Sequence, residues 1–313
     1  ARITIGGVLL TSAGAVAWTN ALQAWQLVPA LLLSGAGWAA MSGAALNAMV
    51  APWFERDRPK AISIAFNGAS VGSLLFTPLW SESIADAGLS PTGFLVALIT
   101  VALVCPLVWR FLLPAPGGAS KAGPPLPRRA LLAHWGFATM SIAFALGMFA
   151  QIGLFAHLIA RLEPDFGSAI AAFAISLVAL CAVFGRTLLG WLLADHDRRL
   201  AAAANFLVQA AGSILLALGD GTVPLTIGCV LFGLGVGNLN SLPPLIAQRE
   251  FRAADVGTVV ALVIAINQAV FAFAPAILGL LRDLSGSYVM AFLGVATLQG
   301  LAAATVAWGR RFS

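Results

Sequence analysis

Long runs of apolar residues, separated by short polar connections, set the strongest limit on how this chain can fold. Crossing about 30 Å of hydrocarbon takes about 20 residues as a helix, and each segment must satisfy its own backbone hydrogen bonds. Hydrophobic residues make up 60% of the chain and charged residues only 9%. Lipid rather than water must therefore cover most of the surface, and we predict an all-α, polytopic helical membrane protein.

Ten runs in the sequence are long enough to be membrane spans. They cover residues 3–20, 27–50, 61–85, 92–113, 130–158, 168–194, 200–219, 222–247, 256–281 and 287–309. The Pro- and Gly-rich stretch 114–129 has no apolar periodicity and is not expected to hold a helix. We therefore predict an N-terminal bundle of four spans over 1–113, a cytoplasmic linker over 114–129 and a C-terminal six-helix bundle over 130–313.

The basic residues indicate how the chain is oriented in the membrane. Of the 17 Lys and Arg residues, all but Arg161 and Arg282 lie at the chain ends or in alternate connections on one side. Because cytoplasmic loops carry the excess of Lys and Arg, both chain ends should be cytoplasmic, with the protein in the cell (inner) membrane. The net charge of +5 does not indicate nucleic-acid binding, because the basic residues are spread over short loops between spans.

An internal repeat relates the two predicted bundles. Shifting the sequence by 197 residues places Asp86 on Asp283 and the Phe76 segment (Phe-Thr-Pro) on the Phe273 segment (Phe-Ala-Pro). Residues 130–197 have no partner under this shift. The repeat therefore predicts that two helices are missing before residue 1, and the alternative is a natural ten-span protein.

A polar hairpin is expected where the stretch 185–199 separates two long apolar runs. It contains Arg186, Gly190, Asp195, Arg198 and Arg199. The order of glycine, small residue, Asp and paired Arg resembles the loop signature of the major facilitator superfamily of secondary transporters. Gly190 lies five residues before Asp195, where the signature has four. The alternative interpretation is that these arginines only set topology.

A second stretch resembles one branch of that superfamily. Three features follow one another here: the segment from Asn47 to Phe54, the bases Arg56, Arg58 and Lys60, and the small-residue helix from Asn67 to Gly72. Their order resembles that found in the monocarboxylate and oxalate/formate branch.

The resemblance implies a two-bundle fold with about ten of twelve helices present. It also implies a secondary active transporter that moves a small organic solute by alternating access, with a proton or a counter-substrate coupled to it. Asp195 is then expected to pair with Arg198, Arg199 or Arg186 in one state and to release them in another. The hairpin should therefore act in the conformational cycle rather than in substrate contact.

Neutral polar residues within the spans are the candidates for a substrate cavity. An amide in lipid is costly unless it faces protein or a water-filled space. The candidates are Ser70, Gln151, Asn238, Asn240, Asn267 and Gln268. The repeat places Ser70 on Asn267, which favours Asn267 as a contact. In contrast, Asn205 and Gln209 lie on a span that faces lipid in the family pattern.

Charge is scarce at the centre of the predicted spans, and this bears on the substrate. Carboxylate carriers of the resembled branch place a basic residue in the eighth or eleventh helix. The matching segments here offer only Arg186, near the cytoplasmic end, and 259–280 carries no charge. A counter-charge for an ionic solute would have to come from the helices predicted to be missing before residue 1. If those helices supply none, the sequence favours a neutral or weakly polar solute.

An enzyme is not indicated by the sequence. His134, His157 and His196 lie near span ends, without neighbours spaced for metal ligation or nucleophile activation. We expect no catalytic residue, no metal and no cofactor. The alternative function is a non-transporting receptor or regulatory membrane protein on a transporter-like fold.

Overall fold

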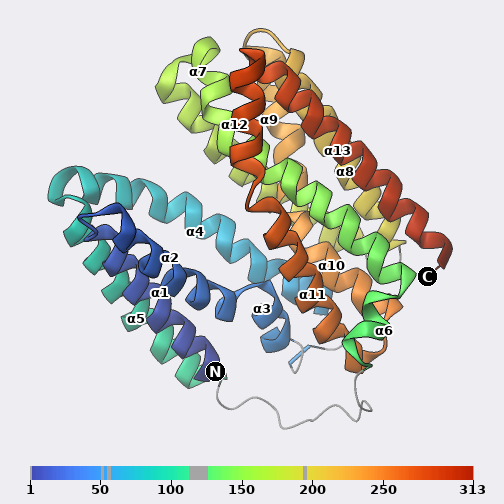
Figure 1. Ribbon diagram of the computed structural model, residues 1–313, viewed down its shortest axis with the longest axis horizontal. Helices are drawn as coiled ribbons and strands as arrows, with labels where there is room; N and C mark the ends of the chain where they lie inside the picture. The colour runs from blue at the N-terminus through green and yellow to red at the C-terminus, as the bar shows by residue number, and fades with distance from the viewer. Residues whose placement is uncertain (1, 51–52, 55–57, 113–125, 193–195, 313) are drawn as a thin grey trace. The chain divides into compact units, whose positions relative to one another are not determined.

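Helices make up the part of the chain that the computed structural model describes, residues 2–312 except 51–52, 55–57, 113–125 and 193–195 (Figure 1). They are α1 Arg2–Thr19, α2 Ala24–Met41, α3 Gly43–Val50, α4 Arg58–Ala87, α5 Leu89–Leu112, α6 Arg128–Leu132, α7 Trp135–Leu192, α8 Arg198–Leu218, α9 Thr222–Val236, α10 Asn238–Glu250, α11 Ala253–Phe271, α12 Ala274–Ser285, α13 Tyr288–Gly309 and the short 3₁₀ helix η1 Arg310–Phe312. Within the described ranges, 8 helical stretches are long and apolar enough to cross a membrane. The prediction of an all-α, polytopic membrane protein is confirmed.

The first compact unit comprises residues 1–58 and 72–119. Its helix α1 packs along both α2 and α5. The contact between α1 and α2 requires small residues, because a Cβ atom at Gly37 would lie 2.5 Å from the carbonyl oxygen of Gly7. This close approach of two backbones is typical of helices that associate within a membrane.

The second compact unit comprises residues 59–71 and 120–313. Helix α8 lies alongside α13, α7 and α9, and Figure 1 shows it next to α13 over much of its length. Large side chains fill the space between these helices, and the rings of Phe144 and Phe206 meet edge to face with centroids 5.5 Å apart. The site residues described below are carried mainly by the helices of this unit.

Helix α7 joins two of the predicted spans. It is interrupted at Gly167, whose backbone has φ 74° and ψ 162°, a conformation that L-residues with a side chain rarely adopt. Pro164 precedes this kink and lacks the N–H that a continuous helix would need. The connection predicted near Glu163, between spans 130–158 and 168–194, therefore takes the form of a sharp kink.

Three predicted single spans are each divided into two helices. The span predicted at 27–50 breaks after Met41, between α2 and α3. The span predicted at 222–247 breaks at Gly237, between α9 and α10, and the span predicted at 256–281 breaks between α11 and α12. Pro243 and Pro244 lie inside α10, whereas Pro275 lies in the first turn of α12, where a missing N–H is tolerated. The apolar runs alone did not indicate where each span is divided.

The helix bounds follow the internal repeat. Adding 197 to the bounds of α1 gives 199–216, which lies within α8, and adding it to α5 gives 286–309, which covers α13. The break after Met41, between α2 and α3, has its counterpart in the break at Gly237. The two halves therefore share their element order and this one interruption, whereas α4 is continuous where its counterpart is divided into α11 and α12.

The predicted linker, 114–129, falls largely on residues outside the description. Its last residues are described: α6 begins at Arg128, and the backbone N–H of Leu126 donates to Asp255 Oδ1 at 2.7 Å. Residues 59–71 belong to the second unit, although the sequence assigns them to the N-terminal bundle. The bundle bounds given above remain a prediction.

Candidate functional site

The polar hairpin is shorter than the sequence suggested. Helix α7 continues to Leu192 and α8 begins at Arg198, so Arg186 and Gly190 lie on a helix rather than in a loop. The reason is that the leucine-rich segment after Arg186 favours helix and continues the apolar pattern of α7. Asp195 lies outside the described residues, and its proposed pairing remains a prediction.

Arg186 is buried at the junction between α7 and the break that separates α9 from α10. Only 4% of the residue is exposed. Its Nε donates to the carbonyl oxygen of Gly237 at 2.9 Å, and its Nη1 donates to Asn67 Oδ1 at 2.8 Å. Gly237 lies between the two helices, as the C-cap of α9 and the N-cap of α10, so the break brings its carbonyl oxygen within reach of Arg186.

The charge of Arg186 is not balanced by an acid among the described residues. Both of its hydrogen-bond acceptors, Gly237 and Asn67, are neutral, and none of the ion pairs formed by described residues includes it. A guanidinium carries five N–H donors in a planar fork that suits a carboxylate. Because a buried charge without a partner is costly, this site has the chemistry to attract an anion.

Arg199 occupies a different environment at the start of α8. Its Nε and Nη2 bind the two carboxylate oxygens of Glu250 at 2.6 and 2.7 Å. The same guanidinium donates to Thr139 Oγ1 at 3.1 Å and to the carbonyl oxygen of Gly136 at 2.8 Å. The described partner of Arg199 is thus Glu250 on α10, an acid to which the sequence analysis gave no role.

Asp197 caps the N-terminus of α8. Its carboxylate accepts hydrogen bonds from the backbone N–H groups of Arg199 and Leu200, at 2.9 and 3.2 Å, and forms an ion pair with Arg310 at 2.5 Å. Partial burial alone would raise the pKa of the Asp197 carboxyl. The two backbone hydrogen bonds and the Arg310 guanidinium outweigh burial and hold that pKa below its usual value of 3.8.

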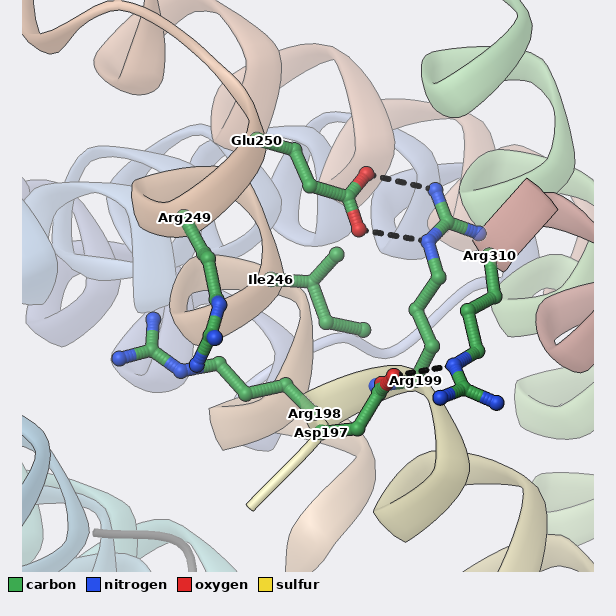
Figure 2. Close-up of a pocket in the computed structure, with 7 residues that line it drawn as sticks. All are labelled: Asp197, Arg198, Arg199, Ile246, Arg249, Glu250 and Arg310. Atoms are coloured by element: carbon green, nitrogen blue, oxygen red, sulfur yellow. Dashed lines mark hydrogen bonds and ion pairs between the residues drawn. The ribbon is translucent and has the colours of Figure 1, made fainter. Parts of the chain in front are cut away.

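These side chains surround a pocket where α8 begins and α10 ends. Its volume is about 350 Å³. Figure 2 shows the two acids engaged with Arg199 and Arg310, while Arg198 and Arg249 lie on the other side of the pocket. The pocket is lined by Asp197, Arg198, Arg199, Ile246, Arg249, Glu250 and Arg310.

A stripe of polar residues along α8 faces the protein interior, although the resemblance implies that this span faces lipid. Asn205, Gln209 and Ser213 are all buried. Gln209 donates to Gln151 Oε1 at 3.1 Å and accepts from Gln299 Nε2 at 3.2 Å. The four-residue spacing along the stripe places the three side chains on one helix face. Amide side chains on α7 and α13 form hydrogen bonds with this face.

The predicted cavity residues do not form one group. Gln151 belongs to the amide network just described, and Asn238 donates to Asn205 Oδ1 at 2.7 Å. Asn267 is buried, and its Oδ1 has no hydrogen-bond partner among the described residues. Gln268 is half-buried and Asn240 is exposed, while the side chain of Ser70 lies outside the description. Their role as substrate contacts remains a prediction.

Three polar partners in these contacts are not evident from the sequence. Glu250, Gln299 and Asn67 were not singled out as partners, although each is a polar residue at or within an apolar segment. Glu250 lies at the end of a predicted span, next to several arginines. An acid in that position indicates an ion pair. Nothing in the sequence alone indicates that Gln299 meets Gln209, because the two residues are 90 positions apart.

Comparison with known proteins gives one family. A model described as Major Facilitator Superfamily matches residues 1–275. Monocarboxylate transporter 13 of Rattus norvegicus is 26% identical over 268 residues, which are 84% of this chain and 62% of that protein. Monocarboxylate transporter 13 of Bos taurus is 30% identical over 190 residues, 59% of this chain and 44% of that protein. The chain therefore spans less than two thirds of the length of these relatives.

Solved structures show the same fold. A variant of the E. coli fucose:proton symporter FucP matches with a TM-score of 0.73 and 16% identity, over 98% of this chain and 83% of that chain. The human organic anion transporter MFSD10 (TETRAN) matches with a TM-score of 0.78 and 15% identity, over 97% of this chain and 76% of that chain. At these identities the likeness concerns the fold.

Proposed function

Because the chain belongs to the major facilitator superfamily, we propose that it is a secondary active transporter that moves a small organic solute across the membrane by alternating access. In this scheme the solute site opens to one face of the membrane and then to the other. A proton or a counter-substrate drives the movement. The family match supports transport over the alternative of a receptor, and protein-dependent flux in proteoliposomes would separate the two.

We further propose that the solute is a small organic anion that carries a carboxylate. The observation behind this proposal is Arg186, a guanidinium that is 4% exposed and has only neutral acceptors among the described residues. The names of the monocarboxylate transporter relatives support the same class. A neutral solute was favoured by the sequence because Arg186 lies near a span end, but burial makes its charge more effective than that position suggested.

The test compares Arg186 with another arginine. Reconstituted full-length protein would be assayed for uptake of short monocarboxylates and of the matching uncharged amides. We expect Arg186→Gln to reduce monocarboxylate uptake by about 10- to 100-fold, because a charge-assisted hydrogen bond contributes about 1.5 to 3 kcal/mol. Arg186→Lys should retain part of the activity, since the charge remains but the planar fork is lost.

Arg282→Gln is the matched control. Arg282 is half-exposed, with 50% of its side chain accessible, and pairs with Asp283, so its loss should leave uptake unchanged. Equal uptake of the acids and their amides, with no effect of Arg186→Gln, would contradict the carboxylate proposal. Transport itself would still be established by uptake of the amides.

The proposed orientation places both chain ends in the cytoplasm of the cell that carries this protein in its inner membrane. The asymmetric distribution of Lys and Arg supports it. A cysteine introduced at Ser120 should be protected from an impermeant thiol reagent in intact cells, whereas one introduced at Asp165 should react. The reverse pattern would overturn the orientation.

A further inference from the structure

The pocket at the start of α8 contains more positive than negative charge. Four arginines and two acids line it, together with Ile246. Glu250 is engaged in a bidentate pair with Arg199, and Asp197 is engaged with Arg310 and with the N-terminus of α8. Both described acids of the pocket are therefore already used.

Arg198 and Arg249 remain as a pair of like charges. Figure 2 shows their guanidinium groups on the same side of the pocket, and their positive charges act unfavourably on each other. Arg198 donates to the carbonyl oxygen of Leu245, a neutral acceptor, and Arg249 is exposed. Neither has an acidic partner among the described residues, so an anion placed between them would relieve their repulsion.

We propose that this pocket binds a phosphate group through Arg198 and Arg249. Guanidinium groups bind phosphate through two parallel N–H···O bonds, and two adjacent groups can bind one phosphate together. The volume of about 350 Å³ lies at the small end of ligand pockets, which suits a headgroup rather than a large solute. The site is separate from Arg186, and the proposal does not depend on which solute is carried.

The position of the pocket favours a lipid phosphate as the source. The arginines lie where α8 begins and α10 ends, at the basic side of the spans. Arginine clusters at the cytoplasmic end of membrane helices lie at the level of the lipid headgroups, where anionic lipids are attracted to them. Free inorganic phosphate has the same chemistry, and the experiment distinguishes the two sources.

The test measures binding directly. Full-length protein in neutral detergent would be titrated with phosphatidylglycerol or phosphatidylcholine, and bound lipid counted by native mass spectrometry. We expect phosphatidylglycerol to bind preferentially. Arg249→Gln should weaken that binding about fivefold and Arg198→Gln/Arg249→Gln about 25-fold, because each arginine near the headgroup contributes about 1 kcal/mol.

The control is Arg128→Gln/Arg129→Gln. It removes the same charge from two exposed residues of α6 that do not line the pocket. Binding should remain within about twofold of the unmodified protein. If both double variants lose phosphatidylglycerol binding equally, the lipid is attracted by general surface charge and the proposal is overturned. It is also overturned if the two lipids bind equally and inorganic phosphate does not bind.

Inorganic phosphate decides the source. If millimolar phosphate stabilises the protein against heat and this effect disappears in Arg198→Gln/Arg249→Gln, without preferential lipid binding, the site takes free phosphate and the phosphate proposal stands. The single variant Arg249→Gln separates loss of binding from loss of folding. Because Arg249 is exposed, its replacement should leave the unfolding temperature without phosphate unchanged.

Discussion

Two buried arginines of the second unit differ in how their charge is balanced. Arg199 is 1% exposed and holds the carboxylate of Glu250 through two hydrogen bonds, with neutral acceptors around it. Arg186 is 4% exposed and has only the oxygens of Gly237 and Asn67 as described partners. The first arginine is neutralised within the fold, whereas the second has no acid among the described residues to balance its charge.

The difference shows that burial alone does not identify a functional charge. A buried ion pair with all its hydrogen bonds satisfied belongs to the scaffold, and removing one partner leaves the other charge buried and unpaired. A buried cation with neutral partners is the better indicator of a ligand site.

The largest effect is expected from breaking the Arg199–Glu250 pair. Glu250→Gln should lower the free energy of unfolding by about 3 to 5 kcal/mol, because Arg199 is then left buried and unpaired. Arg186→Gln should cost only about 1 kcal/mol, since a neutral amide can still donate to one of its acceptors. Thermal and denaturant unfolding in detergent would measure both.

A double variant provides the control for that contrast. Arg199→Met/Glu250→Leu removes both charges and should be less destabilised than Glu250→Gln alone. If Glu250→Gln and Arg186→Gln lower the free energy of unfolding equally, the charges of Arg199 and Arg186 are balanced in the same way. That result would contradict the distinction between the two arginines.

Disrupting the network of neutral amides along α8 should cause the next largest loss of stability. Gln209→Leu removes the partner of both Gln151 and Gln299, and each unsatisfied amide costs about 1 to 3 kcal/mol. We expect a loss of about 2 to 4 kcal/mol in stability. Gln268→Leu is the matched control because Gln268 is half-buried and outside this network, and a loss as large as that of Gln209→Leu would contradict the prediction.

A smaller effect is expected at Asn267, measured as substrate binding rather than stability. Asn267 has an Oδ1 without a described partner, whereas Gln268 is half-buried. Asn267→Ala should weaken substrate binding by about 1 to 2 kcal/mol, the value of one hydrogen bond, and Gln268→Ala should have less effect. Small and equal effects in a binding assay on full-length protein would place the contact elsewhere.

The smallest effect is expected from the cap at Asp197, through pH. Because its pKa is lowered in the folded state, its contribution is complete above the unfolded value of 3.8 and is lost as the pH falls through the lower folded value. The contribution should be about 1 kcal/mol, since the side chains of Asp197 and Arg310 are 32% and 53% exposed and salt screens the pair.

The measurement is the unfolding temperature of Asp197→Ala and of the unmodified protein as the pH is lowered. The difference between them should be constant from pH about 7 to about 5 and should shrink below about 4. A difference that grows on acidification would have the wrong sign and would exclude this role for Asp197.

The sequence by itself determined the helical membrane fold. Apolar runs of about 20 residues leave the backbone no other way to satisfy its hydrogen bonds in lipid, so their positions follow from local composition. The recurrence of helix bounds at an interval of 197, as between α1 and α8, was also readable from the chain. Arg186 and Asn267 could be named from sequence because polar residues in apolar runs are conspicuous.

Only the tertiary structure decided which polar groups meet. Glu250 is 51 residues from Arg199, and Gln299 is 90 residues from Gln209. A sequence pattern shows that a helix has a polar stripe, but the rotation of that helix in the bundle decides whether the stripe faces lipid or protein. Helix packing therefore turned Asn205 and Gln209 inward, gave Arg199 an acid and left Arg186 with neutral described partners.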